Sequence, residues 1–409
     1  MYKEITQCRI CNGTHLDQVL SLGNQSLTGV FPKNIDDKIT AGPVDMVWCK
    51  DCGLLQLKQS YSLSEMYGDN YGYRSGLNNF MVKHLQQKIH TIEKLAKLNP
   101  DDIVIDIGSN DATSLKAYTL PCIKVGIDPT GNKFKEHYTN DITLIPDFFS
   151  ADLFNEKFPG KKAKIITSIA MFYDLESPGN FVKDIESILG NEGLWHFEQS
   201  YMPSMLRTNS YDTLCHEHLE FYSLKVIKNL LEANGMKLID VQMNDINGGS
   251  FAVTAAKIDA PYKANDAVIN WLLQQEQDMG LDTAEPYIAF AERMVKHKQQ
   301  LMSLLNALVA DGKKVFGYGA STKGNVLLQY CGITSHQVPY VAEVNEQKFG
   351  CYTPGTFIPI ISEKEAKELS PDYFLVLPWH FRHTILEREK EYREKGGKFI
   401  FPLPEIEIV

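Results

Sequence analysis

Two pairs of cysteines constrain the N-terminal part of the chain more than any other feature. Cys8 and Cys11 form one C-x-x-C motif, Cys49 and Cys52 form a second, and 37 residues (12–48) separate them. Two short turns that each present a pair of thiolates suit one tetrahedral zinc ion, and four sulfur ligands leave no open coordination position. We therefore expect a closed structural zinc site, in a lobe where the long intervening segment forms a hairpin.

The segment around residue 105 has the pattern of a parallel α/β sheet. The apolar run 103–107 predicts a buried strand, which leads through a glycine-containing turn into a helix beginning near Ser114. Ligands bind at the carboxyl ends of such strands, so we expect a cofactor site at this turn. Neighbouring elements of the same layer are expected at 76–98 and 181–189 (helices) and at 123–128, 165–170 and 193–198 (strands).

Acidic residues at the strand ends favour S-adenosylmethionine over a dinucleotide as the cofactor. Asp106 stands at the mouth of the turn, where it suits a cationic amino-acid group and repels phosphate. Asp128 ends the next strand, the place where a carboxylate accepts hydrogen bonds from a ribose diol. Ala112 replaces the later glycine usual in such turns, so the turn must be one that alanine can adopt. The predicted cofactor contacts are Asp106, Gly108, Ser109, Asn110, Asp128, Asp147 and Phe148, the last two in the position that binds adenine.

The segment 211–223, YDTLCHEHLEFYS, is the densest set of reactive side chains in the sequence. Glu217 lies between His216 and His218, and a histidine near a carboxylate is a suitable general base close to neutral pH. On a strand, both histidines would face one side and Glu217 the other. The spacing differs from H-E-x-x-H and does not predict a helical zinc site. A polar turn whose histidines bond to backbone groups explains the same residues equally well.

A second strand–turn–helix unit follows in the C-terminal half. A helical pattern from Pro286 to residue 310 precedes a strand and the loop 317–325, GYGASTKGN, and two more strands are expected at 338–344 and 373–377. Thr322 occupies the place of the third glycine of a dinucleotide fingerprint, which disfavours NAD. Lys323 and the loop amides are suited to a pyrophosphate, because helix N-termini bind anions. An ordinary solvated lysine is the alternative.

Charge and hydropathy exclude several classes of partner. The chain has 409 residues, with 41 Lys+Arg and 51 Asp+Glu. This acidic balance argues against nucleic acid as a bulk electrostatic partner, and no apolar run reaches the roughly 18 residues of a membrane-spanning helix. The first residues lack the pattern of a signal peptide. We therefore expect a cytoplasmic protein of several domains that binds neither nucleic acid nor membrane. Its oligomeric state is left open.

The order and spacing of these motifs resemble those of the S-adenosylmethionine-dependent sugar-nucleotide C-methyltransferases. The resemblance rests on the four-cysteine lobe, the loop DIGSND (106–111), the HEH segment, the NGGS turn (247–250) and the loop 317–325, and it covers nearly the whole chain. It implies an α/β fold with a zinc-binding lobe over 1–70 and a Rossmann-like methyltransferase domain over 71–245. A second Rossmann-like domain, over 246–409, would hold a nucleotide-sugar.

The resemblance also implies a reaction. A methyl group passes from S-adenosylmethionine to the carbon alpha to the keto group of a nucleotide-linked 4-keto deoxysugar, through an enolate. The base corresponds to His218, with Glu217 beside it and His216 as the alternative base. A tyrosine near the reacting carbon corresponds to Tyr71 or Tyr73. Predicted substrate contacts are Tyr222, Asn247, Ser321, Lys323, Asn345 and His380.

Three other functions fit parts of the pattern. The same scaffold is compatible with O-methylation, or with another S-adenosylmethionine-dependent reaction on a nucleotide-sugar. An NAD-dependent sugar oxidoreductase would use the C-terminal glycine loop. A non-enzymatic zinc adaptor would need the zinc lobe alone, and the two separate ligand loops speak against it.

Overall fold

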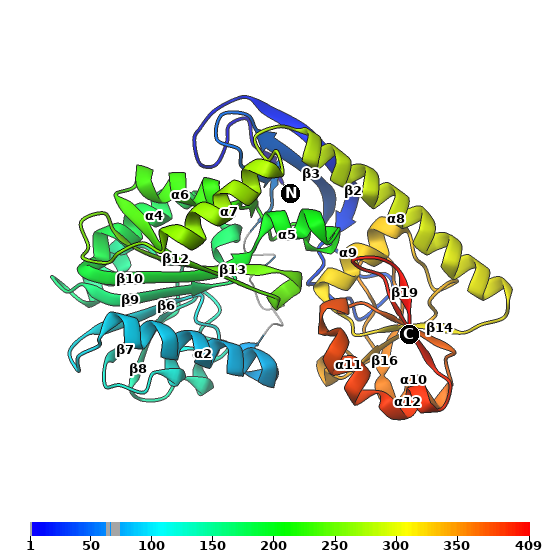
Figure 1. Cartoon of the computed structure of the whole chain (residues 1–409). Coiled ribbons are helices and arrows are strands. Elements are labelled where there is room, and N and C mark those ends of the chain that lie inside the picture. Colours follow the sequence, from blue (N-terminus) through cyan, green and yellow to red (C-terminus); the bar gives the residue numbers. More distant parts are fainter. Residues whose placement is uncertain (1, 63–65, 67–73) are drawn as a thin grey trace.

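A computed structural model describes residues 2–62, 66 and 74–409 of the chain. The two candidate tyrosines, Tyr71 and Tyr73, lie outside the described residues. Figure 1 shows a sheet with helices on both faces at the left, a second α/β unit at the right, and the N-terminal lobe above and between them. Among the described helices, none combines the length and apolar character that a membrane span requires.

The left-hand unit is built on a seven-stranded sheet of described residues, in the order β12-β13-β10-β9-β6-β7-β8. All its strands are parallel except β13, which is antiparallel to both neighbours. From β6 the chain continues to β7 on one side of that strand, whereas β9 lies on the other side of β6. Ligands bind at such a switch point in the strand order. The strands are β6 (Ile103–Ile107), β7 (Ile123–Ile127), β8 (Ile142–Ile145), β9 (Ala163–Ile169), β10 (Leu189–Ser200), β12 (Met236–Asn244) and β13 (Ser250–Lys257).

Helices cover both faces of this sheet, as the unbroken apolar run of β6 requires. Ile103 and Ile105 pack in one core with Phe181 of α4, whereas Val104 points to the other face and packs with Ile92 of α2. This two-sided packing confirms the predicted α/β fold class. The helices of the unit are α2 (Asn79–Ala96), α3 (Ala151–Lys157), α4 (Pro178–Ile188), α5 (Met202–Arg207), α6 (Leu224–Ala233) and α7 (Asp266–Asp278).

The helix predicted to begin near Ser114 is wrong. The turn after β6 leads only into a single 3-10 turn, η2 (Leu115–Ala117). Asn110 and Ala112 both take positive φ angles, 50° and 60°, so the backbone is left-handed where a helix would start. Few residues then remain before β7, and Pro121 is one of them.

The N-terminal lobe is an antiparallel sheet that borrows a strand from much later in the chain. Within the described part, its order is β11-β4-β3-β2. The segment between the cysteine motifs forms the predicted hairpin, with β2 and β3 paired along most of their length. Its strands are β2 (Leu16–Ser26), β3 (Ala41–Cys49), β4 (Leu55–Leu57) and β11 (Glu220–Phe221), and beside them β1 (Lys3–Glu4) pairs with β5 (Gln59–Ser60).

The C-terminal unit has the strand order typical of a dinucleotide-binding sheet. Its described strands lie in the order β16-β15-β14-β17-β18-β19, all parallel except β19. The loop 317–325 follows β14, beside the switch point between β14 and β17. The elements are α8 (Glu285–Ala310), β14 (Val315–Tyr318), α9 (Thr322–Cys331), β15 (Val341–Glu343), β16 (Ile360–Ser362), α10 (Glu363–Glu368), β17 (Tyr373–Val376), η8 (Trp379–Phe381), α11 (Arg382–Arg388), α12 (Lys390–Glu394), β18 (Lys398–Phe401) and β19 (Glu407–Ile408).

The N-terminal lobe packs into the cores of both other units. Its hairpin residues Leu20 and Met46 belong to the same apolar cluster as Phe316 of β14. Cys8 and Cys49 instead pack with the interior of the seven-stranded sheet. The boundary expected at residue 246 falls inside the β12–β13 hairpin, because the seven-stranded sheet continues to Lys257. The three parts are therefore joined by shared cores and a shared strand.

Candidate active site and zinc centre

The two cysteine motifs meet at one point. The four sulfur atoms lie within 4.8 Å of one another, and the Cys8–Cys52 and Cys11–Cys49 sulfur pairs are each 3.6 Å apart. Four sulfurs at about 2.3 Å from a tetrahedral zinc would be about 3.8 Å apart. The cluster therefore fits a closed zinc site with four cysteine ligands.

Arg9, inside the first cysteine motif, connects the zinc site to the strand that follows the HEH segment. Its buried guanidinium donates to the Gln59 carbonyl at 3.2 Å and to the Ser60 hydroxyl at 2.8 Å. Its Nε lies 3.7 Å from a carboxylate oxygen of Glu220. Burial raises the pKa of Glu220 well above its usual range, and Arg9 opposes that shift. The pair attaches β11 to the zinc motif.

The turn after β6 forms a compact cradle. Gly108 has a φ of 72°, and a side chain there would press against Met171, so only glycine fits. The amide of Asn110 donates to an Asp128 carboxylate oxygen at 2.7 Å, and the Ser109 hydroxyl lies 2.7 Å from the Tyr138 hydroxyl. The cradle thus brings the end of β7 against the turn, where Asp128 also accepts the amide and the hydroxyl of Thr130, both at 2.6 Å.

Asp106 is a buried carboxyl at the mouth of the cradle. It is 3% exposed and accepts a hydrogen bond from the Thr167 hydroxyl at 2.6 Å. Burial raises its pKa to about 7, and the nearby charge of Asp128 adds to the rise. A cationic group placed beside it would stabilise the ionised form. Farther along the same edge, Phe148 is 52% exposed next to Asp147, which leaves an aromatic face open.

The HEH segment is a bend and not a strand, so the alternation of side chains along a strand does not apply to its histidines. His216 is fully buried against the N-terminal lobe, where its Nε2 donates to the Gly42 carbonyl at 3.3 Å and its ring meets Tyr61 edge-on. His218 points the other way and contacts the ring of Tyr173. Only β11, two residues later, is extended. The two histidines therefore have separate surroundings.

His218 is held in one orientation and one tautomer. Its Nδ1 donates to the Thr213 carbonyl at 2.8 Å, since a carbonyl oxygen only accepts. The other nitrogen, Nε2, is left with its lone pair. Burial lowers the pKa of His218 to about 4, and the Lys323 ammonium contributes to the lowering. The imidazole is therefore neutral at pH 7, the form that accepts a proton.

Glu217 connects the HEH segment to the N-terminal lobe. The Thr28 hydroxyl donates to its carboxylate at 3.3 Å. A side chain at Gly29 would meet the same carboxylate on one side and Thr322 on the other. Burial raises the pKa of Glu217. Residues of the N-terminal lobe, of the unit with the seven-stranded sheet and of the C-terminal unit thus meet around this carboxylate, and we call this region the junction.

Lys323 reaches from the C-terminal unit into the same junction. Its ammonium donates to the Asn247 carbonyl at 2.6 Å. Burial lowers its pKa, while the Asp212 carboxyl opposes the shift. Asn247 and Gly248 have φ angles of 55° and 88°, and the Gly248 backbone lies so close to Trp379 that an added methyl group would be 3.1 Å from its ring. The NGGS turn is therefore an interface between the two units.

His380 and Asp212 complete the junction. Burial lowers the pKa of His380 to about 3, with a further contribution from Lys323. Asp212 accepts a hydrogen bond from the Trp379 indole at 2.8 Å, and burial raises its pKa. The junction therefore combines two neutral imidazoles, those of His218 and His380, with one ammonium group.

Comparison with known proteins identifies the family. Residues 8–67 match the family described as "Putative zinc binding domain", residues 80–241 match "Methyltransferase domain", and residues 245–404 match "C-methyltransferase C-terminal domain". Over 412 aligned residues, 100% of this chain and 97% of the relative, the chain is 30% identical to C-methyltransferase NovU of Streptomyces niveus. The chain belongs to the C-methyltransferase family.

This C-methyltransferase uses S-adenosylmethionine as its methyl donor, as predicted, and the four-cysteine cluster together with the family match confirms the structural zinc. Solved structures resemble it over less than half of its length. Magnesium protoporphyrin IX methyltransferase from Synechocystis is 14% identical, covering 47% of this chain and 87% of its own, with a TM-score of 0.33. An S-adenosylmethionine-dependent methyltransferase from Clostridium acetobutylicum is 11% identical, covering 43% and 92%, with a TM-score of 0.34.

Three predicted substrate contacts of the C-methyltransferase lie away from the junction or have other partners. Tyr222 is fully buried and stacks on Phe172 in the core, so it offers no surface to a ligand. Ser321 caps α9 by accepting a hydrogen bond from the Gly324 amide at 3.0 Å. Asn345 accepts from the Gln347 amide at the start of a 3-10 turn. Residue type and position in a motif do not reveal such local partners.

Other residues of the C-methyltransferase junction were missed in the sequence. Thr28 lies in the lobe and carries no motif. Asp212 and Thr213 belong to the segment 211–223 that contains the HEH motif. Their spacing from His218 matches neither a helical nor a strand period, so the spacing does not predict that these residues lie together. Trp379 is adjacent to His380, which is a predicted substrate contact. A tryptophan between a strand end and that histidine is the sequence feature that could have indicated Trp379 as a site residue.

The glycine loop of the C-terminal unit donates a hydrogen bond to an acidic residue of the same unit. Glu343, at the end of β15, accepts the Ala320 amide at 2.8 Å with one carboxylate oxygen. The other oxygen accepts the amides of Val344 and Asn345. In a dinucleotide site the corresponding carboxylate binds a ribose diol. Here one oxygen is bound by the glycine loop and the other by the backbone that follows β15.

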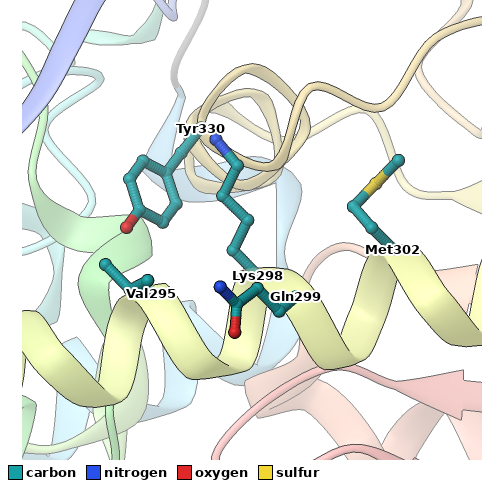
Figure 2. A pocket seen from close by; sticks show the side chains of 5 residues that line it. All are labelled: Val295, Lys298, Gln299, Met302 and Tyr330. Carbon is teal, nitrogen blue, oxygen red and sulfur yellow. The ribbon is translucent and has the colours of Figure 1, made fainter.

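A separate groove lies away from the junction. It has a volume of about 370 Å³ and runs between α8 and α9, where Lys298 lies over the ring of Tyr330 (Figure 2). Its other lining residues are Val295, Gln299 and Met302, and none is a predicted site residue. A small hollow beside His218 and Tyr173 measures about 10 Å³, room for one water at most.

Proposed function

We propose that this C-methyltransferase methylates the carbon alpha to the keto group of a nucleotide-linked 4-keto deoxysugar, through an enolate formed by His218. The observation that carries the proposal is the state of His218. Its imidazole is neutral, its Nδ1 proton is bound to the Thr213 carbonyl, and its Nε2 lone pair is available. A positioned neutral histidine suits removal of a proton from a C–H group acidified by an adjacent carbonyl.

The charges around His218 support an anionic intermediate. As Nε2 takes the alpha proton, negative charge develops on the keto oxygen of the sugar. The Lys323 ammonium lies in the same junction, and an ammonium fixed in place before the reaction stabilises such charge without reorganisation. We therefore assign Lys323 to the enolate in place of a pyrophosphate. Glu217, held by Thr28, fixes the backbone next to the base.

The methyl donor belongs at the cradle after β6. When bound, S-adenosylmethionine supplies an electrophilic methyl group. Asp106 would bind the cationic amino group of the donor and Phe148 its adenine. Asp128 would bind the ribose by exchanging the hydrogen bond that it now accepts from the Thr130 hydroxyl. The Gly108 backbone allows close approach, since no side chain stands there. This assignment rests on the buried carboxyl of Asp106 and on the open face of Phe148.

Donor binding should depend on pH through Asp106. Since its pKa is about 7 and a cationic ligand favours the carboxylate, the affinity for S-adenosylmethionine should fall about fourfold between pH 8 and pH 6. The fall is less than the roughly tenfold loss of carboxylate because the donor's α-amino group, with an ordinary pKa of about 7.7–8.0, is itself partly neutral at pH 8. Isothermal titration calorimetry across this range measures the change. Asp106→Asn should bind weakly at every pH, whereas Asp147→Asn should keep the dependence. An affinity that is constant from pH 6 to 8 in the unmodified enzyme would contradict the assignment.

The reaction itself is tested with a labelled methyl donor. S-adenosylmethionine with a deuterated methyl group is incubated with a panel of 4-keto nucleotide-sugars that carry deuterium at the alpha carbons. Mass spectrometry should find a product that gains one labelled methyl group and loses one alpha deuterium beyond the exchange seen without enzyme. Methyl gain with the alpha deuterium retained would indicate O-methylation. No transfer to any member of the panel would reject the substrate class.

A further inference from the structure

Three successive residues of η5 (Tyr211–Thr213) each bond to a different part of the protein. Tyr211 bonds to α8, Asp212 bonds to η8, and the Thr213 carbonyl accepts from His218. The first two partners belong to the C-terminal unit, and η5 also packs against α9 of that unit. The turn that holds the base is therefore itself held by another domain.

The first contact is a buried hydrogen-bond chain. His297 of α8 donates from Nε2 to the Pro402 carbonyl at 2.6 Å. Its Nδ1 is then the acceptor, and the Tyr211 hydroxyl donates to it at 2.8 Å. Burial lowers the pKa of His297, which keeps it in this neutral form. Tyr211 is fully buried, and its hydroxyl also lies 3.4 Å from the Cys331 sulfur of α9.

The second contact lies on the other side of the turn. The Trp379 indole donates to an Asp212 carboxylate oxygen at 2.8 Å. Asp212 is 1% exposed, and its second oxygen has no hydrogen-bond partner among the described residues. Because a buried carboxyl with a single donor depends strongly on that donor, loss of the indole N–H would release Asp212.

We propose that His297 and Trp379 are positioning residues, which clamp η5 so that the Thr213 carbonyl holds His218 in its reactive tautomer. The inference rests on the proposed role of His218 as the base. A displacement of about 1 Å in a catalytic group can cost about 100-fold in rate. The clamp also makes the base depend on correct docking of the C-terminal unit.

The experiment removes one hydrogen bond of the clamp at a time from the full-length, zinc-loaded enzyme. Tyr211→Phe deletes the hydroxyl that bonds to His297, and Trp379→Phe deletes the indole N–H. Each should lower kcat by about 10- to 100-fold, with little change in the affinity for S-adenosylmethionine. Tyr330→Phe is the matched control. Its ring contacts that of Tyr211, but in the described part of the chain its hydroxyl bonds to no residue of η5, so kcat should stay unchanged.

Nitrogen-15 NMR of the histidine side chains separates positioning from general stability. The His218 signal, identified by its absence in His218→Asn, should report the Nδ1–H tautomer in the unmodified enzyme and a mixture in Tyr211→Phe and Trp379→Phe. Lys323, Glu217, Glu220 and Tyr173 also face or flank His218, and these substitutions leave all four in place.

The outcomes distinguish the two proposals. Both variants retaining full kcat, or losing kcat with the tautomer unchanged, would overturn the clamp. If Tyr211→Phe fails to fold, judged by near-ultraviolet circular dichroism, Trp379→Phe decides alone. Turnover that persists in His218→Asn would instead reject His218 as the base, and the proposed mechanism with it.

Discussion

Replacing His218 by asparagine is expected to lower kcat by about 10²- to 10⁴-fold, the range that a general base contributes. The asparagine amide can still donate to the Thr213 carbonyl, as Nδ1 does, but nothing replaces Nε2. Binding of S-adenosylmethionine, measured by calorimetry, should therefore be unchanged. Exchange of the alpha deuterium of the substrate should stop together with methyl transfer, because both depend on the same proton abstraction.

His216→Asn provides the comparison within the same motif. His216 is buried against Gly42 and Tyr61 of the lobe, so this substitution should lower the melting temperature more than it lowers alpha-deuterium exchange in the folded enzyme. The reverse pattern, with exchange lost in His216→Asn and retained in His218→Asn, would make His216 the base.

Removing one zinc ligand should have the largest effect on folding. Structural zinc contributes on the order of 10–16 kcal/mol in isolated zinc-finger peptides. Here Cys49 is fully buried and ends β3, and it packs with the core of the methyltransferase unit. Cys49→Ser should lose the zinc, measured by plasma mass spectrometry, and should lose the cooperative thermal transition of the full chain.

Cys122→Ser is the matched control for the zinc prediction. Cys122 lies between η2 and β7, outside the cluster, and it is partly exposed. This variant should retain one zinc per chain and a melting temperature close to that of the unmodified protein. A Cys49→Ser protein with full zinc content and an unchanged melting temperature would show that the four sulfurs are not a metal site.

Local periodicity was sufficient to predict most of the elements that carry the site. The strands β6, β7 and β9 and the helix α8 lie where apolar runs and helical spacing indicate them, because buried parallel strands and long amphipathic helices have strong patterns. The helix near Ser114 was predicted wrongly for a local reason. Left-handed angles at Asn110 and Ala112 have no reliable signal in a single sequence.

The junction was less predictable than the elements around it. His218, Lys323 and His380 were selected as site residues, but their partners come from segments far apart in the chain. Thr28 reaches Glu217 across 189 residues, and Trp379 reaches Asp212 across 167. Tyr222 was selected by its place in a motif and lies in the core. Tertiary packing determines which side chains of a motif face outward.

The strand β11 has a consequence for the order in which the protein is made. It pairs with β4 although 162 residues (58–219) lie between the two strands. A ribosome adding about 5–20 residues per second needs on the order of 10–30 s for that stretch. During that interval the nascent lobe displays an unpaired edge, which favours association with other chains. The edge is paired only after synthesis has passed the HEH segment and reached β11.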